Sequence, residues 1–255
     1  MATIRLNEQK VYYTRPMKAA SGPVLLLIHG AGGNHLVWPK EIQRMRGTTV
    51  YNLDLPGHGR SPGPGRSSID GYADIVQDYM EKLALQNVTI VGHSMGGAVA
   101  QTVALRGLQR VSNLVIVNSG AKLRVAPTIL DQALVDPDLV VDFVIHSSWG
   151  PAAPVALVEL GKKSMQLTDP VAIHGDFLAC DCFDIRSKLD QIRIPTLIIS
   201  GTEDKMTPLK YGRYLADNIA DARLVTVEGA GHFAMLENPE LVAKRIAEFL
   251  GVDDF

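Results

Sequence analysis

The sequence predicts an α/β fold built on a doubly wound, mostly parallel sheet, and two observations carry this prediction. Short apolar runs that end in glycine or a polar loop alternate along the chain with segments of helical apolar spacing, as expected of parallel strands joined by crossover helices. The chain has 255 residues, of which 46% are hydrophobic, and α/β folds of this length are routinely one domain. We therefore expect a single domain whose site lies beyond the carboxyl ends of the strands.

The first strands come from the amino-terminal part of the chain. Polar and apolar residues alternate over residues 3–6 and 10–14, which predicts an exposed hairpin. A strand buried on both faces is predicted at 24–30, where the sequence reads VLLLIHG. Another strand follows within residues 48–59, which read TTVYNLDLPGHG.

The remaining core elements alternate regularly after this point. A helix is predicted over 69–85, capped by Asp70. Its inner side is expected to carry Ile75, Tyr79, Met80 and Leu83. A helix is also predicted from Ser94 onward. Four further strands are predicted at 88–91, 114–120, 195–201 and 222–232.

The alternation stops between Ala121 and about Asp190. This stretch has helical apolar patterns and five prolines but no clear strand pattern, which predicts a helical cap inserted over the carboxyl edge of the sheet. The expected division is a core of residues 1–120 and 191–255, with a cap of residues 121–190.

Composition excludes several classes of partner. The formal net charge of −2 provides no electrostatic footprint for nucleic acid or an anionic membrane. The first twenty residues lack the apolar core of a signal peptide, and no apolar run is long enough to span a membrane. Cys180 and Cys182 are too close in sequence for a good structural disulfide. We expect a reduced, cytoplasmic protein with neither a nucleic-acid nor a membrane partner.

The stretch TIVGHSMGGAV, residues 89–99, predicts a nucleophilic serine. A short β-branched run passes directly into helical spacing at Ser94, so a strand must turn sharply into a helix. Gly92, Gly96 and Gly97 allow the strand, the helix and the neighbouring backbone to approach closely. A Gly-x-Ser-x-Gly pattern in this strand–turn–helix context is typical of a nucleophile elbow, which predicts Ser94 as the nucleophile.

A serine nucleophile requires a base, and the base requires an acid that orients it. The expected chain order of serine, acid and histidine is met by Asp204, just past the 195–201 strand, and by His232, just past the last strand. Glu203, the neighbour of Asp204, is the alternative acid. A histidine base must be neutral to accept a proton, so activity should rise with pH through about 6 to 7.

Two backbone N–H groups are needed to stabilise an oxyanion. Met95, directly after the serine and at the start of a helix, is one candidate. Ala31, in the glycine-rich loop HGAGGNHLVW, is the other, with Gly32 as the neighbouring possibility. The sequence shows neither a phosphate-loop or dinucleotide fingerprint nor a histidine and carboxylate spacing suited to metal, so we expect no cofactor and no metal.

Five segments together carry a resemblance to a known family. They are HGAGGNHLVW, DLPGHGRS, VGHSMGG, GTEDKMTP and GAGHFAMLENPE. From Val24 to Leu250 the chain resembles the α/β-hydrolase family, most closely small cytoplasmic carboxylesterases and related hydrolases with a helical cap. The resemblance implies an eight-stranded sheet, a triad of Ser94, Asp204 and His232, and Ala31 and Met95 as oxyanion donors. Relatives that open epoxides or remove halides carry aspartate at the elbow, so Ser94 favours ester-like acyl transfer.

The expected substrate is a small uncharged ester with a short or medium acyl chain, because the cap region has few fixed charges near its apolar runs. The residues predicted to contact it are Gly32, Trp38, Leu130, Phe143 and Trp149. Two alternatives stay open: a carbon–carbon bond hydrolase or lyase that uses the same residues, and a small-ligand receptor with slow turnover.

Overall fold

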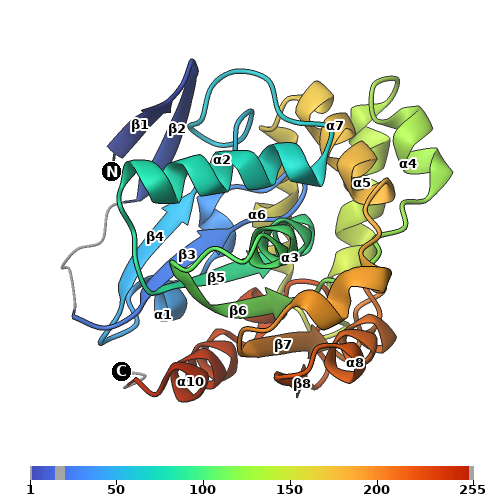
Figure 1. Ribbon diagram of the computed structural model, residues 1–255. Helices are drawn as coiled ribbons and strands as arrows, with labels where there is room; N and C mark the ends of the chain where they lie inside the picture. Colours follow the sequence, from blue (N-terminus) through green and yellow to red (C-terminus); the bar gives the residue numbers. More distant parts are fainter. Residues whose placement is uncertain (1, 15–20, 253–255) are drawn as a thin grey trace.

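A computed structural model of the protein describes residues 2–14 and 21–252, so part of the amino-terminal stretch that underlies the localisation prediction lies outside the described residues. Its centre is an eight-stranded sheet in the order β1-β2-β4-β3-β5-β6-β7-β8 (Figure 1). The strands are β1 (Ala2–Leu6), β2 (Gln9–Thr14), β3 (Val24–Ile28), β4 (Thr49–Leu53), β5 (Val88–His93), β6 (Val111–Val117), β7 (Thr196–Gly201) and β8 (Ala222–Val227). Pairing is antiparallel from β1 to β2 and from β2 to β4, and parallel from β4 through to β8. The predicted fold class is confirmed.

Helices cover both faces of the sheet. They are α1 (Lys40–Gln43), α2 (Ile69–Lys82), α3 (Met95–Leu105), α4 (Pro127–Gln132), α5 (Pro137–Ser148), α6 (Val155–Gln166), α7 (Pro170–Asp181), α8 (Leu209–Asn218), α9 (Ala234–Glu237) and α10 (Pro239–Leu250). In Figure 1, α2 and α3 lie against one face, and α1 and α10 lie against the other. No helix within residues 2–14 and 21–252 has both the length and the apolar character needed to cross a membrane.

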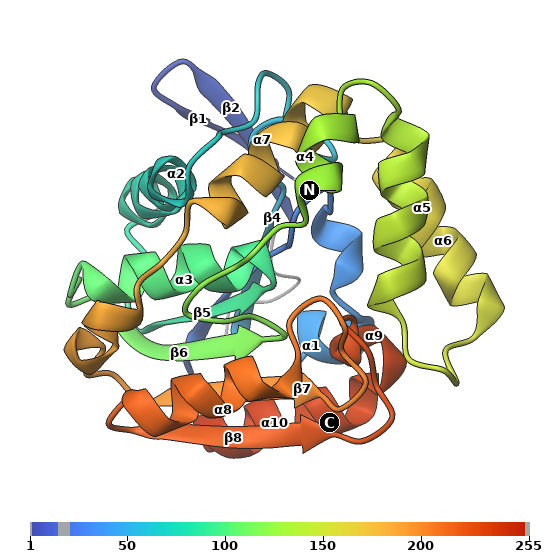
Figure 2. The ribbon, with the colours of Figure 1, turned by 90° about the vertical axis from the view of Figure 1, so that its right-hand side faces the viewer.

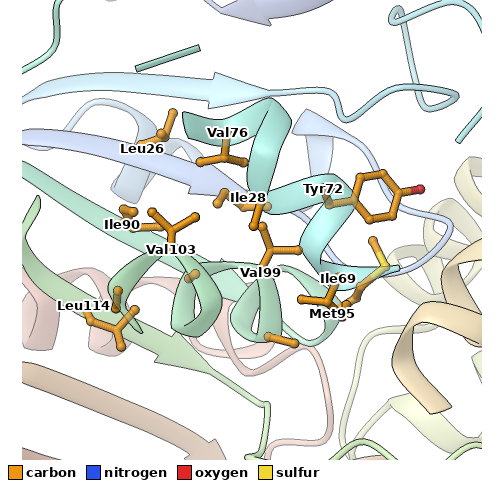
Figure 3. Packing of buried hydrophobic residues seen from close by; sticks show 14 of the residues in the cluster. Leu26, Ile28, Ile69, Tyr72, Val76, Ile90, Met95, Val99, Val103 and Leu114 are labelled. Carbon is orange, nitrogen blue, oxygen red and sulfur yellow. The ribbon is translucent and has the colours of Figure 1, made fainter. Parts of the chain in front are cut away.

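Strand β3 shows why its sequence is apolar throughout. Leu26 and Ile28 join the cluster beneath α2 and α3, while Leu25 and Leu27 join the cluster on the opposite face. Successive side chains of a strand point to opposite faces, so a strand covered on both sides needs apolar residues at every position. Figure 3 shows the first cluster, where side chains of β3, β5 and β6 meet those of α2 and α3.

Two local predictions need correction. The amino-terminal hairpin is exposed on one face only, because Val11 and Tyr13 belong to the core beneath α2, where the Tyr13 ring contacts Tyr79 edge-on at 5.3 Å between centroids. Helix α2 is capped by Ser68, whose hydroxyl accepts a hydrogen bond from Gly71 N, and Asp70 instead lies inside the first turn. Serine in an extended conformation one residue before the helix satisfies the free backbone donors better than a residue already within it.

The segment of residues 121–190 contains α4 to α7, and we call it the α4–α7 segment. An antiparallel bridge between Lys122 and Asp184 joins its two ends. Figure 2 shows α4, α5 and α6 on the side of the molecule toward which the parallel strands point. The apolar side chains of the α4–α7 segment form a separate cluster that also packs against Ala31 and Phe233 of the core loops. The carboxyl edge of the sheet is thereby covered by helices.

Candidate active site

Ser94 occupies a tight connection between β5, which ends at His93, and α3, which begins at Met95. Its φ of 53° lies in the left-handed region, where a non-glycine residue costs about 1–3 kcal/mol. A Cβ on Gly92 would lie 2.1 Å from Gly96 O, and a Cβ on Gly96 would lie 2.3 Å from Ile28 O. These contacts explain why the strand and helix require glycine at both positions.

Hydrogen bonds to strand β6 and the residues after it hold this turn in place. Ser94 N donates to Val117 O at 3.0 Å, and the Ser119 hydroxyl donates to Ser94 O at 2.8 Å. Since the main chain on both sides of the serine is fixed, the surrounding structure holds the strained conformation and keeps the side chain at the apex of the turn.

His232 and Asp204 form a buried pair at the same edge of the sheet. His232 Nδ1 lies 2.9 Å from Asp204 Oδ2, and both residues are at most 5% exposed. A carboxylate can only accept, so Nδ1 carries the proton and Nε2 is left free to act as an acceptor. Glu203 is exposed and Asp204 is buried, so the geometry favours Asp204 over its neighbour as the acid that orients His232.

Five hydrogen bonds hold the Asp204 carboxylate. Besides His232, its donors are the backbone N–H groups of Met206 and Thr207, the Thr207 hydroxyl and the Asn118 amide. Burial opposes ionisation, but the attraction of His232 and the hydrogen bonds outweigh it and lower the pKa of Asp204 to about 2. The carboxylate therefore stays charged in the neutral range.

Asn118 and Thr207 are site residues that the sequence analysis did not find. Asn118 follows β6 with a φ of 46° and reaches Asp204 at 2.8 Å. Thr207 had a local signal, because an aspartate followed by backbone donors two and three residues later is a common turn that fixes a carboxylate. Asn118 had none, because its contact depends on β6 and β7 being neighbours in the sheet.

The loop before His232 packs directly on the connection between α5 and α6. His232 N donates to Ser148 O at 2.6 Å. Glu237 accepts from both Gly150 N and Gly231 N at 2.9 Å, and burial raises the pKa of this carboxyl. The position of the His232 main chain therefore depends on contacts with the α4–α7 segment as well as on β8.

Two further histidines are buried in neutral form beside the site. His29 Nε2 accepts from Leu55 N at 3.0 Å, and His93 Nε2 donates to His232 O at 2.8 Å. Burial lowers the pKa of His29 to about 4 and that of His93 to about 3. Both rings are uncharged and hold the loops of the site in place through these hydrogen bonds.

These two histidines predict a steep acid dependence of stability. An unfolded histidine takes up a proton near pH 6.5, whereas His29 and His93 stay neutral in the folded protein until about pH 4 and 3. Between about pH 6 and 4 the unfolded state therefore binds about two more protons, and each lowers the free energy of unfolding by about 1.4 kcal/mol per pH unit of acidification. Urea unfolding at several pH values measures this slope.

The variant His93→Asn keeps an N–H donor for His232 O and removes one titrating group. We expect its slope to fall from about two protons to about one over the same pH window. An unchanged slope would show that His93 is not held neutral by the fold.

In the loop after β3, the backbone N–H group of Gly32 is already engaged by a side chain. Gly33 N donates to Gly30 O at 3.1 Å, which closes a turn with Gly32 at a φ of 62°. Gly32 N already donates to Asp176 Oδ2 at 2.8 Å. This geometry favours Ala31 over Gly32 as a donor, opposite Met95 at the amino terminus of α3.

A cavity of about 260 Å³ joins these groups. Ser94, His232 and Ala31 line it together, so the predicted nucleophile, base and oxyanion loop share one space. Its remaining wall is mostly apolar and comes largely from α5, α6 and α7. The apolar residues from these helices are Val144, Ile145, Leu157, Leu160, Met165 and Phe177.

Among the predicted substrate contacts, Gly32 and Trp149 line this cavity and three others do not. Trp38 is 1% exposed and packs in the core on the face of the sheet that α1 and α10 cover. Phe143 is 50% exposed on the outside of α5, because one helical residue rotates the side chain by about 100° and its neighbour Val144 takes the inner position. Leu130 packs within the apolar cluster of the α4–α7 segment.

Comparison with known proteins yields consistent matches across almost the whole chain. A model of the alpha/beta hydrolase family matches residues 25–245. The chain is 30% identical to a pimeloyl-[acyl-carrier protein] methyl ester esterase from Neisseria meningitidis, with 88% of this chain and 75% of the relative covered.

Solved structures give the same result. A thermophilic esterase superposes with a TM-score of 0.86 and 31% identity, covering 98% of this chain and 96% of the other. A hydrolase from Pseudomonas aeruginosa superposes with a TM-score of 0.88 and 27% identity, covering 98% of both chains. The matched region includes the Ser94 turn, the His232 loop and the α4–α7 segment.

Proposed function

Because this chain belongs to the alpha/beta hydrolase family, we propose that it is a carboxylesterase-type serine hydrolase in which Ser94 attacks the ester carbonyl. The observation that carries the proposal is the buried His232–Asp204 pair beside a cavity that Ser94 also lines. The similarity to esterases named above supports the same reaction class.

In this proposal Nε2 of His232 accepts the Ser94 hydroxyl proton as the serine oxygen bonds to the carbonyl carbon. Asp204 holds the ring in the tautomer with the proton on Nδ1 and stabilises the imidazolium that forms. The N–H groups of Ala31 and Met95 stabilise the oxyanion. His232 then returns the proton to the departing alcohol, and water hydrolyses the acyl-enzyme by the same steps.

The cavity supports a short or medium acyl chain. A cavity of about 260 Å³ is smaller than the roughly 300–1,000 Å³ of pockets that hold drug-sized ligands. Its walls carry apolar side chains from α5 and α6, and each methylene buried there contributes about 0.8 kcal/mol, or about fourfold in binding.

A series of p-nitrophenyl esters from two to sixteen acyl carbons tests this function. We expect kcat/KM to rise with chain length, to peak between two and eight carbons and to decline for longer chains that the cavity does not hold. A continued rise toward sixteen carbons, especially at a lipid interface, would contradict the proposed substrate class. Efficient cleavage of a carbon–carbon bond together with poor turnover of every ester would contradict the reaction itself.

A further inference from the structure

The α4–α7 segment holds the peptide groups of Gly32 from two sides. Gly32 N donates to Asp176 Oδ2 at 2.8 Å, and the Thr168 hydroxyl donates to Gly32 O at 3.0 Å. Asp176 is 0% exposed and Thr168 is 5% exposed. A Cβ on Gly32 would lie 3.0 Å from Met165 Cε, so the same segment also packs closely over this turn.

Asp176 is itself fixed by two side chains of the core. The Tyr72 hydroxyl donates to Asp176 Oδ1 at 2.5 Å, and His58 Nε2 lies 2.7 Å from Asp176 Oδ2. The other ring nitrogen of His58 lies 3.0 Å from Pro56 O. Because both ring nitrogens face oxygen acceptors, His58 is a cation paired with the Asp176 carboxylate.

The titration of His58 agrees with this geometry. Burial alone would lower its pKa, but the charge of Asp176 and the hydrogen bonds outweigh burial and raise it. The side chains of both partners are fully buried. Hydrogen bonds to charged groups are roughly twice as strong as neutral ones, so this pair fixes the carboxylate that Gly32 N contacts.

The position of Gly32 matters because Ala31 and Gly32 are the two central residues of the Gly30–Gly33 turn. A turn of this kind with glycine as its third residue has two common forms, which differ in the sign of φ at that residue, and here φ of Gly32 is 62°. Asp176 favours this form, because in the other form the Ala31 carbonyl would face the Asp176 carboxylate and two oxygens would repel each other. The Ala31 N–H belongs to the preceding peptide, so its direction depends on where the turn as a whole is held, and the contacts of Gly32 with Asp176 and Thr168 fix that position.

We propose that Asp176, supported by Thr168, is a positioning residue that anchors Gly32, and with it the Gly30–Gly33 turn, so that the adjacent Ala31 N–H stays directed at the reacting oxygen. This inference rests on the proposed function and extends it. The α4–α7 segment then does more than shape the acyl cavity: it completes the oxyanion site through a residue 144 positions away from Gly32 in the chain.

An N–H group that is held toward the oxyanion stabilises the transition state and not the ground-state ester, so its loss lowers kcat more than it changes KM. We expect Asp176→Ala to lower kcat by about 10²–10³-fold, as for the loss of one oxyanion donor, with KM within about twofold of wild type. Asp176→Asn keeps an oxygen acceptor for Gly32 N–H and should recover at least about tenfold of that loss. Asp181→Ala and Asp181→Asn, on the exposed end of the same helix, are matched controls that should leave kcat unchanged.

Binding of an alkyl trifluoromethyl ketone separates positioning from general damage to the fold. The Ser94 oxygen adds to the ketone carbon as its hydroxyl proton passes to His232 Nε2, and the carbonyl oxygen becomes an oxyanion, whereas the matching secondary alcohol cannot form this adduct. We expect Asp176→Ala to weaken ketone affinity in proportion to kcat and to leave alcohol affinity within about twofold. Equal losses for the ketone and the alcohol, or unchanged ketone affinity, would overturn the inference.

Thr168→Val keeps the buried His58–Asp176 pair and removes only the donor to Gly32 O. This variant therefore tests the positioning role even if Asp176→Ala does not fold. We expect parallel losses of about three- to thirtyfold in kcat and ketone affinity, the range of one hydrogen bond. No loss in either would overturn the inference. Wild-type protein that neither hydrolyses esters nor binds the ketone in a Ser94-dependent way would instead overturn the proposed function.

Discussion

Replacing Ser94 with alanine is expected to lower kcat/KM for a preferred p-nitrophenyl ester by about 10⁴–10⁶-fold. The hydroxyl is the only group that the change removes, and in the proposed mechanism its oxygen forms the bond to the acyl carbon. The cavity, the His232–Asp204 pair and the turn after β3 do not depend on it. Initial-rate kinetics measure the loss, and KM or substrate-analogue binding should change little.

Ser112→Ala provides the control for this change. Ser112 lies near the start of β6, where its hydroxyl donates to Asn87, far along the strand from the residues that hold the Ser94 turn. We expect this variant to keep wild-type rates. Ester hydrolysis that survives in the Ser94 variant would assign the activity to another group.

Replacing Asp204 with asparagine is expected to lower kcat by about 10⁴-fold. The carboxylate accepts five hydrogen bonds and fixes the proton of His232 on Nδ1. An amide offers one oxygen and one NH₂ group. If the NH₂ group takes the place of Oδ1, it faces the N–H groups of Met206 and Thr207. If it takes the place of Oδ2, it faces His232. In the second case Nδ1 becomes the acceptor, and Nε2 can no longer accept the serine proton.

Glu203→Gln is the matched control, because it makes the same chemical change at the exposed neighbouring position. Its rates should stay within about twofold of wild type. A larger loss in the Glu203 variant than in the Asp204 variant would transfer the role of acid to Glu203 and contradict the geometry described above.

The parts of the site that the sequence predicted are those with a local physical signature. The close approaches at Gly92 and Gly96 exclude any side chain, so a few adjacent residues are enough to predict the Ser94 turn. Parallel strands end at one edge of the sheet, so the loops after β5, β7 and β8 bring Ser94, Asp204 and His232 to the same edge. The choice between the neighbours Asp204 and Glu203 depends on the local turn, in which Met206 N and Thr207 N donate to Asp204 while Glu203 is exposed.

The parts that could not be predicted depend on how distant elements pack. Asp176 comes from α7 and meets Gly32, Tyr72 and His58, and its only signal in the sequence is a lone acidic residue within residues 171–180, which read VAIHGDFLAC. The predicted substrate contacts Trp38 and Phe143 do not line the cavity, for a related reason. An apolar residue near the site can face the cavity, the far core or solvent, and the rotation of its own element decides which.

Covalent labelling with diethyl p-nitrophenyl phosphate tests the central claim most directly, because this reagent phosphorylates a serine that a neighbouring base has activated. We predict that intact-mass analysis shows one diethylphosphoryl group per chain and that peptide mapping places it on Ser94. Labelling should be lost in Ser94→Ala and strongly slowed in Asp204→Asn. A protein that hydrolyses esters but takes up no label, or takes it up at another residue, would contradict the account.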